Sequence, residues 1–346
     1  MGFSLFNFGS RDLAIDLGTC NTLIYARGRG IVIDEPSIVA LENVDGVPTV
    51  RAIGDEALPM LGRTPVGLRT VRPLRSGVIA DLDVAEQMLK HFINKALGPR
   101  SRLPGKLEVT IAIPSGSTNV ERHAIRDAAS NAGANEIHFV EEPLAAAIGA
   151  DLPVDDPFGS MVCDIGGGTT EVGVISLLGL AYSRSVRVGG DKMDEAVMAM
   201  VRRTHNLQIG ETTAERVKRE IGSARVPADG RGLSLTVKGL DMERGVPKEI
   251  EITEAEVVRA LADPVGQIVS AVRTALEHTA PEISADIIES GITLTGGSSL
   301  LRHLDAVIAE ETGLPVNIAE RPLECVVLGA GQVLEERVGR GVLQAA

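Results

Sequence analysis

The sequence contains few cysteines, few aromatic residues and no excess of basic charge. Its three cysteines, Cys20, Cys163 and Cys325, are scattered and lack the spacing of a metal site or a disulfide framework. We therefore expect reduced thiols, as in a cytoplasmic protein. The formal net charge of −13 argues against nucleic acid as a partner, because a phosphate backbone requires a basic surface.

Long apolar runs are also missing, although 44% of the residues are hydrophobic. The longest runs are too short to span a bilayer, so the sequence indicates a globular protein. A chain of 346 residues should hold two domains or one elaborate domain. Glycine, in contrast, is abundant, and two glycine-containing stretches carry most of the functional information.

The most informative stretch is 161–175, which reads MVCDIGGGTTEVGVI. Its apolar ends predict two short buried strands. Between them, Gly166, Gly167 and Gly168 allow the backbone to bend closely around a ligand, and the N–H groups of such a turn suit phosphate oxygens. Asp164 would repel a bare phosphate, so its position makes sense if a hydrated Mg²⁺ lies between them. An ordinary glycine-rich hairpin is the competing interpretation.

A second stretch at 13–25, LAIDLGTCNTLIY, repeats this order of residues. Three positions match at equal offsets, namely Asp16, Gly18 and Thr22 in this stretch and Asp164, Gly166 and Thr170 in the other. The repetition favours a nucleotide site and predicts two related domains that face one nucleotide. The chain contains no G-x-x-x-x-G-K-[ST], and no G-x-G-x-x-G follows a strand, so neither a P-loop nor a dinucleotide fold is expected.

Strands and helices alternate after each of these stretches. A meander of four strands over 12–41 leads into 43–75, which we interpret as a loop-rich inserted subdomain because it contains four prolines. The second half repeats the plan. This pattern predicts an α/β fold with a mixed sheet in each half and a cleft between the halves.

The motifs resemble those of the actin, sugar kinase and heat-shock ATPase superfamily. DLAIDLGTCNTLIY is similar to its first phosphate motif, MVCDIGGGTTEVGVI to the second and ITLTGGSSLLRHL to its adenosine motif. FVEEPLAAAIGA and VVLGAGQVLEE resemble its two interdomain connectors. LRSGVIADLD, GGDKMDEAV and TTAERVKREIG are closer still to the MreB family of bacterial actins.

The resemblance implies an actin-like α/β fold, with two related domains of ribonuclease H-like topology around a nucleotide cleft. Domain I is expected at 1–150, with subdomain IB at about 34–70 and a C-terminal helix at about 322–346 that returns to it. Domain II is expected at 151–321, with subdomain IIB at about 189–252.

The resemblance also implies that the cleft binds ATP or ADP with Mg²⁺. Asp16 and Asp164 would hold the Mg²⁺ through water. The residues expected to contact the nucleotide are Gly18, Thr19, Cys20, Asn21, Gly166, Gly167, Gly168, Ala214, Glu215, Lys218, Gly296, Gly297 and Ser298.

Some of these positions have a second explanation or depart from the family pattern. Thr212-Thr213-Ala214-Glu215 also reads as a capping box, and Lys218 as an exposed helix charge. Leu23 stands where actin has a lysine, so Mg²⁺ and backbone N–H groups would have to neutralise the phosphates. Ser298 replaces a glycine that is frequent in the adenosine motif.

Glu142 matches the connector residue that orients the attacking water in this superfamily, and Thr169 can support the same water. Phosphoryl transfer to water depends mainly on such positioning. Glu141 is the rival, because the sequence alone does not separate adjacent carboxylates. Glu142 would also complement the dipole of the helix that it begins.

The implied function is that of a weak ATPase that polymerises with itself into cytoskeletal filaments. Such filaments would associate with the inner face of the cytoplasmic membrane and direct cell-wall synthesis and rod shape, together with membrane proteins of the elongation machinery. A small-molecule kinase using the same cleft is the alternative, but the sequence offers no clear catalytic aspartate for a substrate hydroxyl. A chaperone ATPase would need a substrate-binding domain, for which we find no segment.

Phe3, Leu5, Phe6 and Phe8 form an apolar N-terminal segment that could lie in a membrane interface. The competing interpretation is that the segment packs on its own domain or between subunits. The basic loop LGPRSRLPG at 97–105 would add a second lipid contact through its leucines, Leu97 and Leu103.

Overall fold

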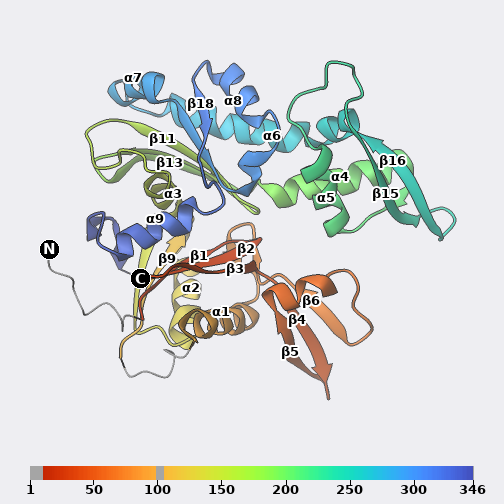
Figure 1. Cartoon of the computed structure of the whole chain (residues 1–346), viewed down its shortest axis with the longest axis horizontal. Helices are drawn as coiled ribbons and strands as arrows, with labels where there is room; N and C mark the ends of the chain where they lie inside the picture. Colours follow the sequence, from red (N-terminus) through yellow and green to blue (C-terminus); the bar gives the residue numbers. More distant parts are fainter. Residues whose placement is uncertain (1–10, 99–104, 346) are drawn as a thin grey trace.

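The computed structural model describes residues 11–98 and 105–345, which form two halves that each contain a central sheet (Figure 1). The predicted membrane contacts lie outside these ranges, with the exception of Leu97. That side chain is buried in the core of the first half, so the prediction that Leu97 contacts lipid is wrong. No helix in the described ranges has the length and apolar content needed to cross a membrane.

The sheet of the first half has six strands in the order β19-β10-β9-β1-β2-β3. Their bounds are β1 Leu13–Leu17, β2 Asn21–Ala26, β3 Gly30–Pro36, β9 Glu108–Ile113, β10 Glu136–Glu141 and β19 Gln344–Ala345. β1 runs antiparallel to β2 and parallel to β9, so the sheet is mixed, as predicted. The end of β1 that carries Asp16 therefore lies beside the turn into β2.

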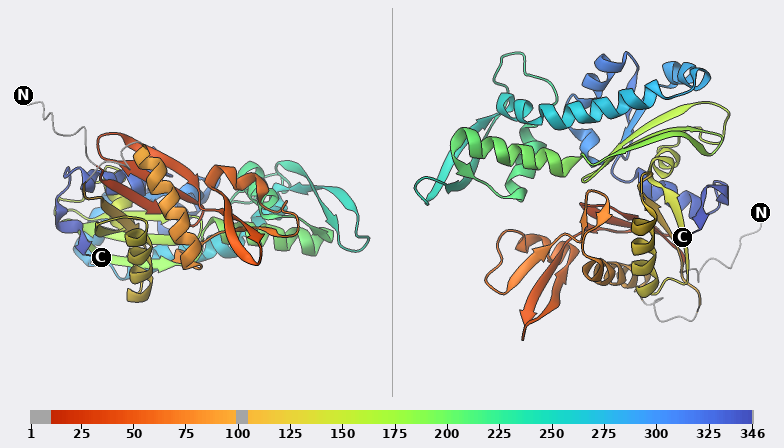
Figure 2. Two further views of the ribbon diagram at one scale, coloured as in Figure 1. Left: turned by 90° about the horizontal axis from the view of Figure 1, so that it is seen from below. Right: turned by 180° about the vertical axis from the view of Figure 1, so that it is seen from behind.

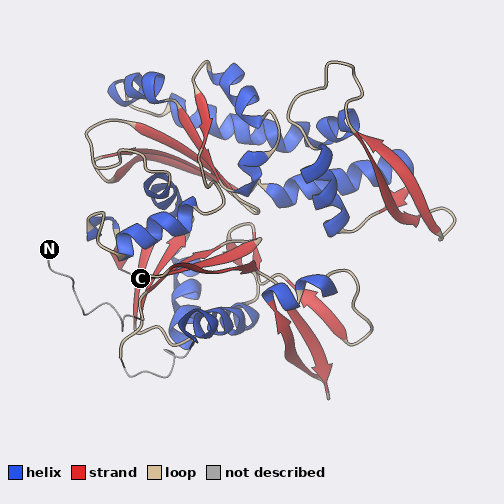
Figure 3. Ribbon diagram, viewed as in Figure 1, coloured by secondary structure: helices blue, strands red, loops and turns tan. Residues whose placement is uncertain are grey.

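Two helices, α1 Leu82–Leu97 and α2 Asn119–Asn131, cover one face of this sheet (Figure 3). Val84, Met88 and Phe92 recur at helical spacing and are buried, which fixes the face that α1 turns toward the sheet. The first turn of α2 is closed by the capping box of Thr118 and Glu121.

The sheet of the second half has the order β13-β12-β11-β17-β18. Its strands are β11 Ser160–Ile165, β12 Thr170–Ser176, β13 Gly179–Val186, β17 Ile292–Thr295 and β18 Val316–Ile318. The helices of this half are α4 Gly190–His205, α5 Glu211–Ile221, α6 Glu254–Glu277, α7 Pro281–Ser290 and α8 Leu304–Thr312. The β11–β12 hairpin therefore has the same place in this sheet as β1–β2 has in the first.

Smaller sheets project from the same side of the molecule in both halves (Figures 1 and 2). The first half carries β4 Val39–Val44, β5 Val47–Ile53 and β6 Leu68–Val71, followed by the hairpin of β7 Leu74–Arg75 and β8 Val78–Ile79. The second carries β14 Leu207–Gln208, β15 Ser234–Asp241 and β16 Pro247–Thr253.

The first small sheet corrects one prediction and refines another. The fourth strand of the predicted meander, β4, leaves the main sheet and pairs with β5 and β6. The stretch 43–75 therefore contains residues of β4, β5, β6 and β7, although more than half of it lies outside strands. Of its four prolines, Pro48 lies in the edge strand β5, where a missing N–H costs little, and the other three lie outside strands.

The two halves meet where α3 Glu142–Gly149 crosses α9 Cys325–Leu334. A Cβ at Gly149 would overlap the carbonyl oxygen of Cys325, and a Cβ at Gly329 would overlap that of Ala145. Both glycines are therefore needed for the backbones to touch. The predicted C-terminal helix is shorter than 322–346, and the chain after it adds β19 to β10.

Candidate functional site

The turns of the β1–β2 and β11–β12 hairpins line one cavity of about 560 Å³. A cavity of this size falls in the usual range for small-molecule sites. All but one of the residues predicted to contact nucleotide, metal or attacking water line it: Asp16, Gly18, Thr19, Cys20, Asn21, Glu142, Asp164, Gly166, Gly167, Gly168, Thr169, Glu215, Lys218, Gly296, Gly297 and Ser298.

Ala214 is the exception, and its predicted contact with the nucleotide is not supported. Its side chain is fully buried in the hydrophobic core, on the same face of α5 as Val217 and Ile221. Glu215 and Lys218 lie on the neighbouring face and reach the cavity. The predicted capping box is also absent, because α5 begins at Glu211 after Gly210 and has no side-chain cap.

The glycines of the two turns allow the hairpins to approach each other. A Cβ at Gly167 would overlap the sulfur of Cys20, and a Cβ at Gly168 would overlap the hydroxyl of Thr19. The sequence interpretation explained these glycines by the approach of a ligand. The structure adds that the opposite hairpin also requires them.

Two carboxylates, the half-buried Asp16 and the buried Asp164, face the cavity from the two sheets. Burial raises the pKa of Asp16 to about 7, with further contributions from Asp164 and Asp34. Burial also raises the pKa of Asp164 to about 6, although a hydrogen bond from Thr295 Oγ1 (2.7 Å) opposes this shift. A cation between the carboxylates would offset the cost of burying their charge.

This donor set fits a hydrated Mg²⁺, which takes oxygen ligands and usually retains several waters. Within residues 11–98 and 105–345, no group of three or more His, Cys, Asp or Glu is placed to hold a metal ion directly. The prediction that Asp16 and Asp164 act through water is compatible with that arrangement.

The structure separates the two adjacent glutamates of the connector. Glu142 lines the cavity. Burial is the main reason that its pKa lies well above the usual value, and the negative charges of Glu171, Asp16 and Asp164 raise this pKa further. Glu141 is not part of the cavity lining and lies 3.9 Å from the guanidinium of Arg122. The geometry therefore favours Glu142 as the residue that acts in the cleft.

Glu171 is a buried charged residue behind the site that the sequence interpretation missed. Its carboxylate accepts hydrogen bonds from Ser115 Oγ (2.7 Å), from Ser115 N (3.2 Å) and from the hydroxyl of Ser185. Ser115 belongs to the first half, so the contact joins the halves. An acidic residue inside the apolar strand β12 was the available signal.

Glu171 and Leu23 occupy equivalent places in the two hairpins. Each is paired across its hairpin with the strand-end aspartate, Leu23 with Asp16 and Glu171 with Asp164. Leu23 lines the cavity, so the residue that replaces the lysine of actin borders the same cavity as the two hairpin turns.

Ser298 and Gly296 tie the predicted adenosine motif to the second hairpin. Ser298 Oγ donates to the carbonyl oxygen of Gly166 (2.9 Å), a bond that a glycine at 298 would lack. Gly296 has a φ of +79°, and a Cβ there would overlap the backbone of Ile165. The serine therefore adds a hydrogen bond between the predicted adenosine motif and the second hairpin, and it is compatible with a backbone-lined site.

Lys218 contacts the start of α4 at the rim of the cavity. Its Nζ donates to the carbonyl oxygen of Gly190 (3.1 Å) and to Asp194 Oδ2 (2.9 Å). The interpretation of Lys218 as an exposed helix charge is therefore wrong.

The Cys20 thiol is a neutral side chain in the cavity wall. Burial is the main reason that its pKa rises to about 12.

A third turn, between β7 and β8, reaches the two hairpins and was not predicted to do so. Gly77 N donates to Thr19 Oγ1 (3.2 Å), and a Cβ at Gly77 would clash with the side chain of Thr169. Gly77 lines the cavity. The glycine in LRSGVIADLD was the signal for this close approach.

The family model described as MreB/Mbl protein matches residues 10–340. The chain belongs to the MreB/Mbl family. It is 52% identical over 328 residues to the cell shape-determining protein MreB of Escherichia coli K12, covering 94% of each chain. It is 45% identical over 326 residues to the cell shape-determining protein Mbl of Bacillus subtilis, covering 94% of this chain and 96% of Mbl.

Among solved structures, the chain is similar to MreB5 of Spiroplasma citri bound to ADP. The TM-score is 0.87 at 35% identity, and the match covers 95% of this chain and 98% of MreB5. The same protein bound to AMPPNP gives a TM-score of 0.86. These findings confirm the resemblance to the MreB family and the prediction of an actin-like fold.

Proposed function

We propose that this protein binds ATP and ADP with Mg²⁺ in the cleft, hydrolyses ATP weakly and assembles into filaments that associate with the membrane and direct cell-wall synthesis. One observation carries the nucleotide site: two like hairpins, one from each half, line a single cavity and each contributes an aspartate. The ADP and AMPPNP complexes of MreB5 support it.

The backbone of both turns would bind the phosphates. Gly18–Asn21 and Gly166–Gly168 line the cavity and offer N–H donors, which suit anionic oxygens. Asp16 and Asp164 would hold a Mg²⁺ through water, and the ion would neutralise phosphate charge. Lys218, Glu215 and Gly296 would border the nucleoside.

Glu142 would accept a hydrogen bond from the attacking water and orient it, with Thr169 in support. Its raised pKa makes the carboxylate a stronger base than an exposed glutamate, and a base works best when its pKa is near the working pH. A position at the start of α3, where the two halves join, would make this orientation depend on how the halves close on ATP.

Asp164→Ala should weaken ATP binding in the presence of Mg²⁺ but leave the fold intact. The fold should survive because burial already disfavours the charge of this carboxylate. We would titrate ATP with and without Mg²⁺ into the unchanged protein, into Asp164→Ala and into Asp155→Ala, which removes the same charge from an exposed site. If ATP binding by all three proteins depends on Mg²⁺ to the same extent, Asp164 does not hold the Mg²⁺.

Membrane association is proposed to depend on Phe3, Leu5, Phe6 and Phe8. Burying four such side chains contributes on the order of 6–10 kcal/mol before losses, and ordering the segment costs about 1–2 kcal/mol per residue. A single copy should therefore bind lipid weakly. A filament presents many copies, so each bound subunit holds its neighbours near the membrane.

Deleting residues 2–8 should abolish most of the co-sedimentation of filaments with anionic liposomes without changing ATP affinity. The unchanged protein should pellet strongly as filaments and weakly as a monomer. Equal co-sedimentation of the deletion variant and the unchanged protein with liposomes would show that residues 2–8 are not the membrane anchor. Strong co-sedimentation of a polymerisation-deficient variant would show that membrane binding does not require many copies in a filament.

A further inference from the structure

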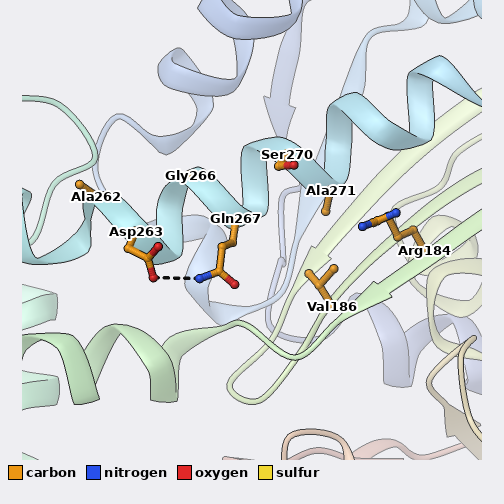
Figure 4. Close-up of a pocket in the computed structure, with 8 residues that line it drawn as sticks. All are labelled: Arg184, Val186, Ala262, Asp263, Gly266, Gln267, Ser270 and Ala271. Atoms are coloured by element: carbon orange, nitrogen blue, oxygen red, sulfur yellow. Dashed lines mark hydrogen bonds between the residues drawn. The ribbon is translucent and has the colours of Figure 1, made fainter.

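A second cavity, which shares no lining residue with the first, lies between the edge strand β13 and the helix α6. Its volume is about 350 Å³, and Figure 4 shows the side chains that surround it. Arg184 and Val186 come from β13, whereas Ala262, Asp263, Gly266, Gln267, Ser270 and Ala271 come from α6. We call this cavity the β13–α6 groove.

Arg184 is the cationic group of the groove, and none of the residues in 11–98 and 105–345 gives it an anionic partner. Its Nε is buried without a hydrogen-bond acceptor. In the described part of the chain, no carboxylate pairs with its guanidinium: Asp263, which also lines the groove, instead accepts a hydrogen bond from Gln267 (2.8 Å). A half-buried guanidinium without a partner favours the binding of a carboxylate or another anion.

Gly266 leaves the floor of the groove open. It lies inside α6, where glycine is less favourable than alanine. A Cβ at this position would meet no atom within 4 Å. Packing within the chain therefore does not require glycine here, and its effect is to keep room above the helix.

The edge of β13 provides backbone groups beside the same groove. β13 is the terminal strand of its sheet, and among the strands that the structure describes only β12 pairs with it. An extended segment added to this edge would turn every second side chain toward the α6 side, as Arg184 and Val186 do.

We propose that the β13–α6 groove binds an extended, acidic peptide segment of a partner protein, which adds to β13 as a strand and places a carboxylate on Arg184. The unpaired guanidinium selects the negative charge, and the free strand edge selects an extended backbone. Asp263, at the other end of the groove in Figure 4, disfavours a highly charged anion such as a phosphate cluster.

The test uses the full chain and a fluorescent, end-capped peptide of alternating threonine and valine with one central glutamate. Binding is measured by fluorescence polarisation, alongside two further probes: one with glutamine in place of the glutamate, and one with prolines beside it. We expect saturable binding of the glutamate probe, about tenfold weaker binding of the glutamine probe because it lacks the charge-assisted bond, and none of the proline probe.

Variants of the protein locate the contact. Arg184→Gln should lower the affinity for the glutamate probe to that for the glutamine probe. Its affinity for the glutamine probe should be unchanged, since only the charge pair is lost. Arg259→Gln, which removes an exposed arginine from the same helix outside the groove, should change neither. Gly266→Leu should block all binding by filling the floor.

Several results would overturn the proposal. Absence of saturable binding, equal binding of the glutamate and proline probes, or an equal effect of Arg184→Gln and Arg259→Gln would each do so. Loss of ATP-dependent sedimentation in Arg184→Gln would also do so, because it would identify the groove as a contact between copies of this chain.

Discussion

Glu142→Ala is expected to bind ATP nearly as well as the unchanged protein but to hydrolyse it at least about a hundredfold more slowly, as loss of a positioned base requires. The carboxylate lines the cavity together with the strand-end aspartates, and we propose that it orients water and does not hold the nucleotide. Affinity and phosphate release must therefore be measured separately.

Glu141→Ala provides the matched control, because it removes the adjacent carboxylate, which pairs with Arg122 outside the cavity. It should hydrolyse ATP at nearly the normal rate. Unchanged hydrolysis in Glu142→Ala would transfer the role to Glu141 or Thr169, and a slow Glu141→Ala protein would favour the former.

Gly329→Ala is expected to destabilise the protein by about 3 kcal/mol or more, at the upper end of the cost of overpacking. The added methyl would overlap the backbone of Ala145 in α3. A backbone cannot move aside as a side chain can, so α3 and α9 would have to separate. Urea denaturation without nucleotide measures the change in the free energy of unfolding.

Gly266→Ala is the control for this effect, since it also adds a methyl group inside a helix but meets no atom within 4 Å. It should stabilise the protein by up to about 1 kcal/mol, because alanine favours helix more than glycine does. Equal effects of Gly329→Ala and Gly266→Ala would show that the contact between α3 and α9 does not need a glycine.

The site was largely predictable because its signals are local in sequence. The repeated order of aspartate, glycine and threonine identified both hairpins, and the structure brings Asp16 and Asp164 to one cavity. Periodicity placed α1, and the capping box of Thr118 placed the start of α2. In each case a few neighbouring residues determine the local conformation.

The remainder depends on contacts between segments that are distant in the chain. The bond from Ser115 to Glu171 joins the two halves, and no local pattern reveals it. The pairing of β19 with β10 follows from the path of the chain after α9. Ala214 was misplaced because the face that a helix turns toward the core depends on packing partners from distant parts of the chain, which the local sequence does not reveal.

We propose that nucleotide binding in the cleft drives the assembly of this chain into filaments. The most direct test is sedimentation combined with negative-stain electron microscopy of the purified protein, with ATP and Mg²⁺, with neither, and for Asp164→Ala with both. Filaments are expected only for the unchanged protein with ATP and Mg²⁺. Equal amounts of filament in all three samples, or none in any, would contradict the proposal.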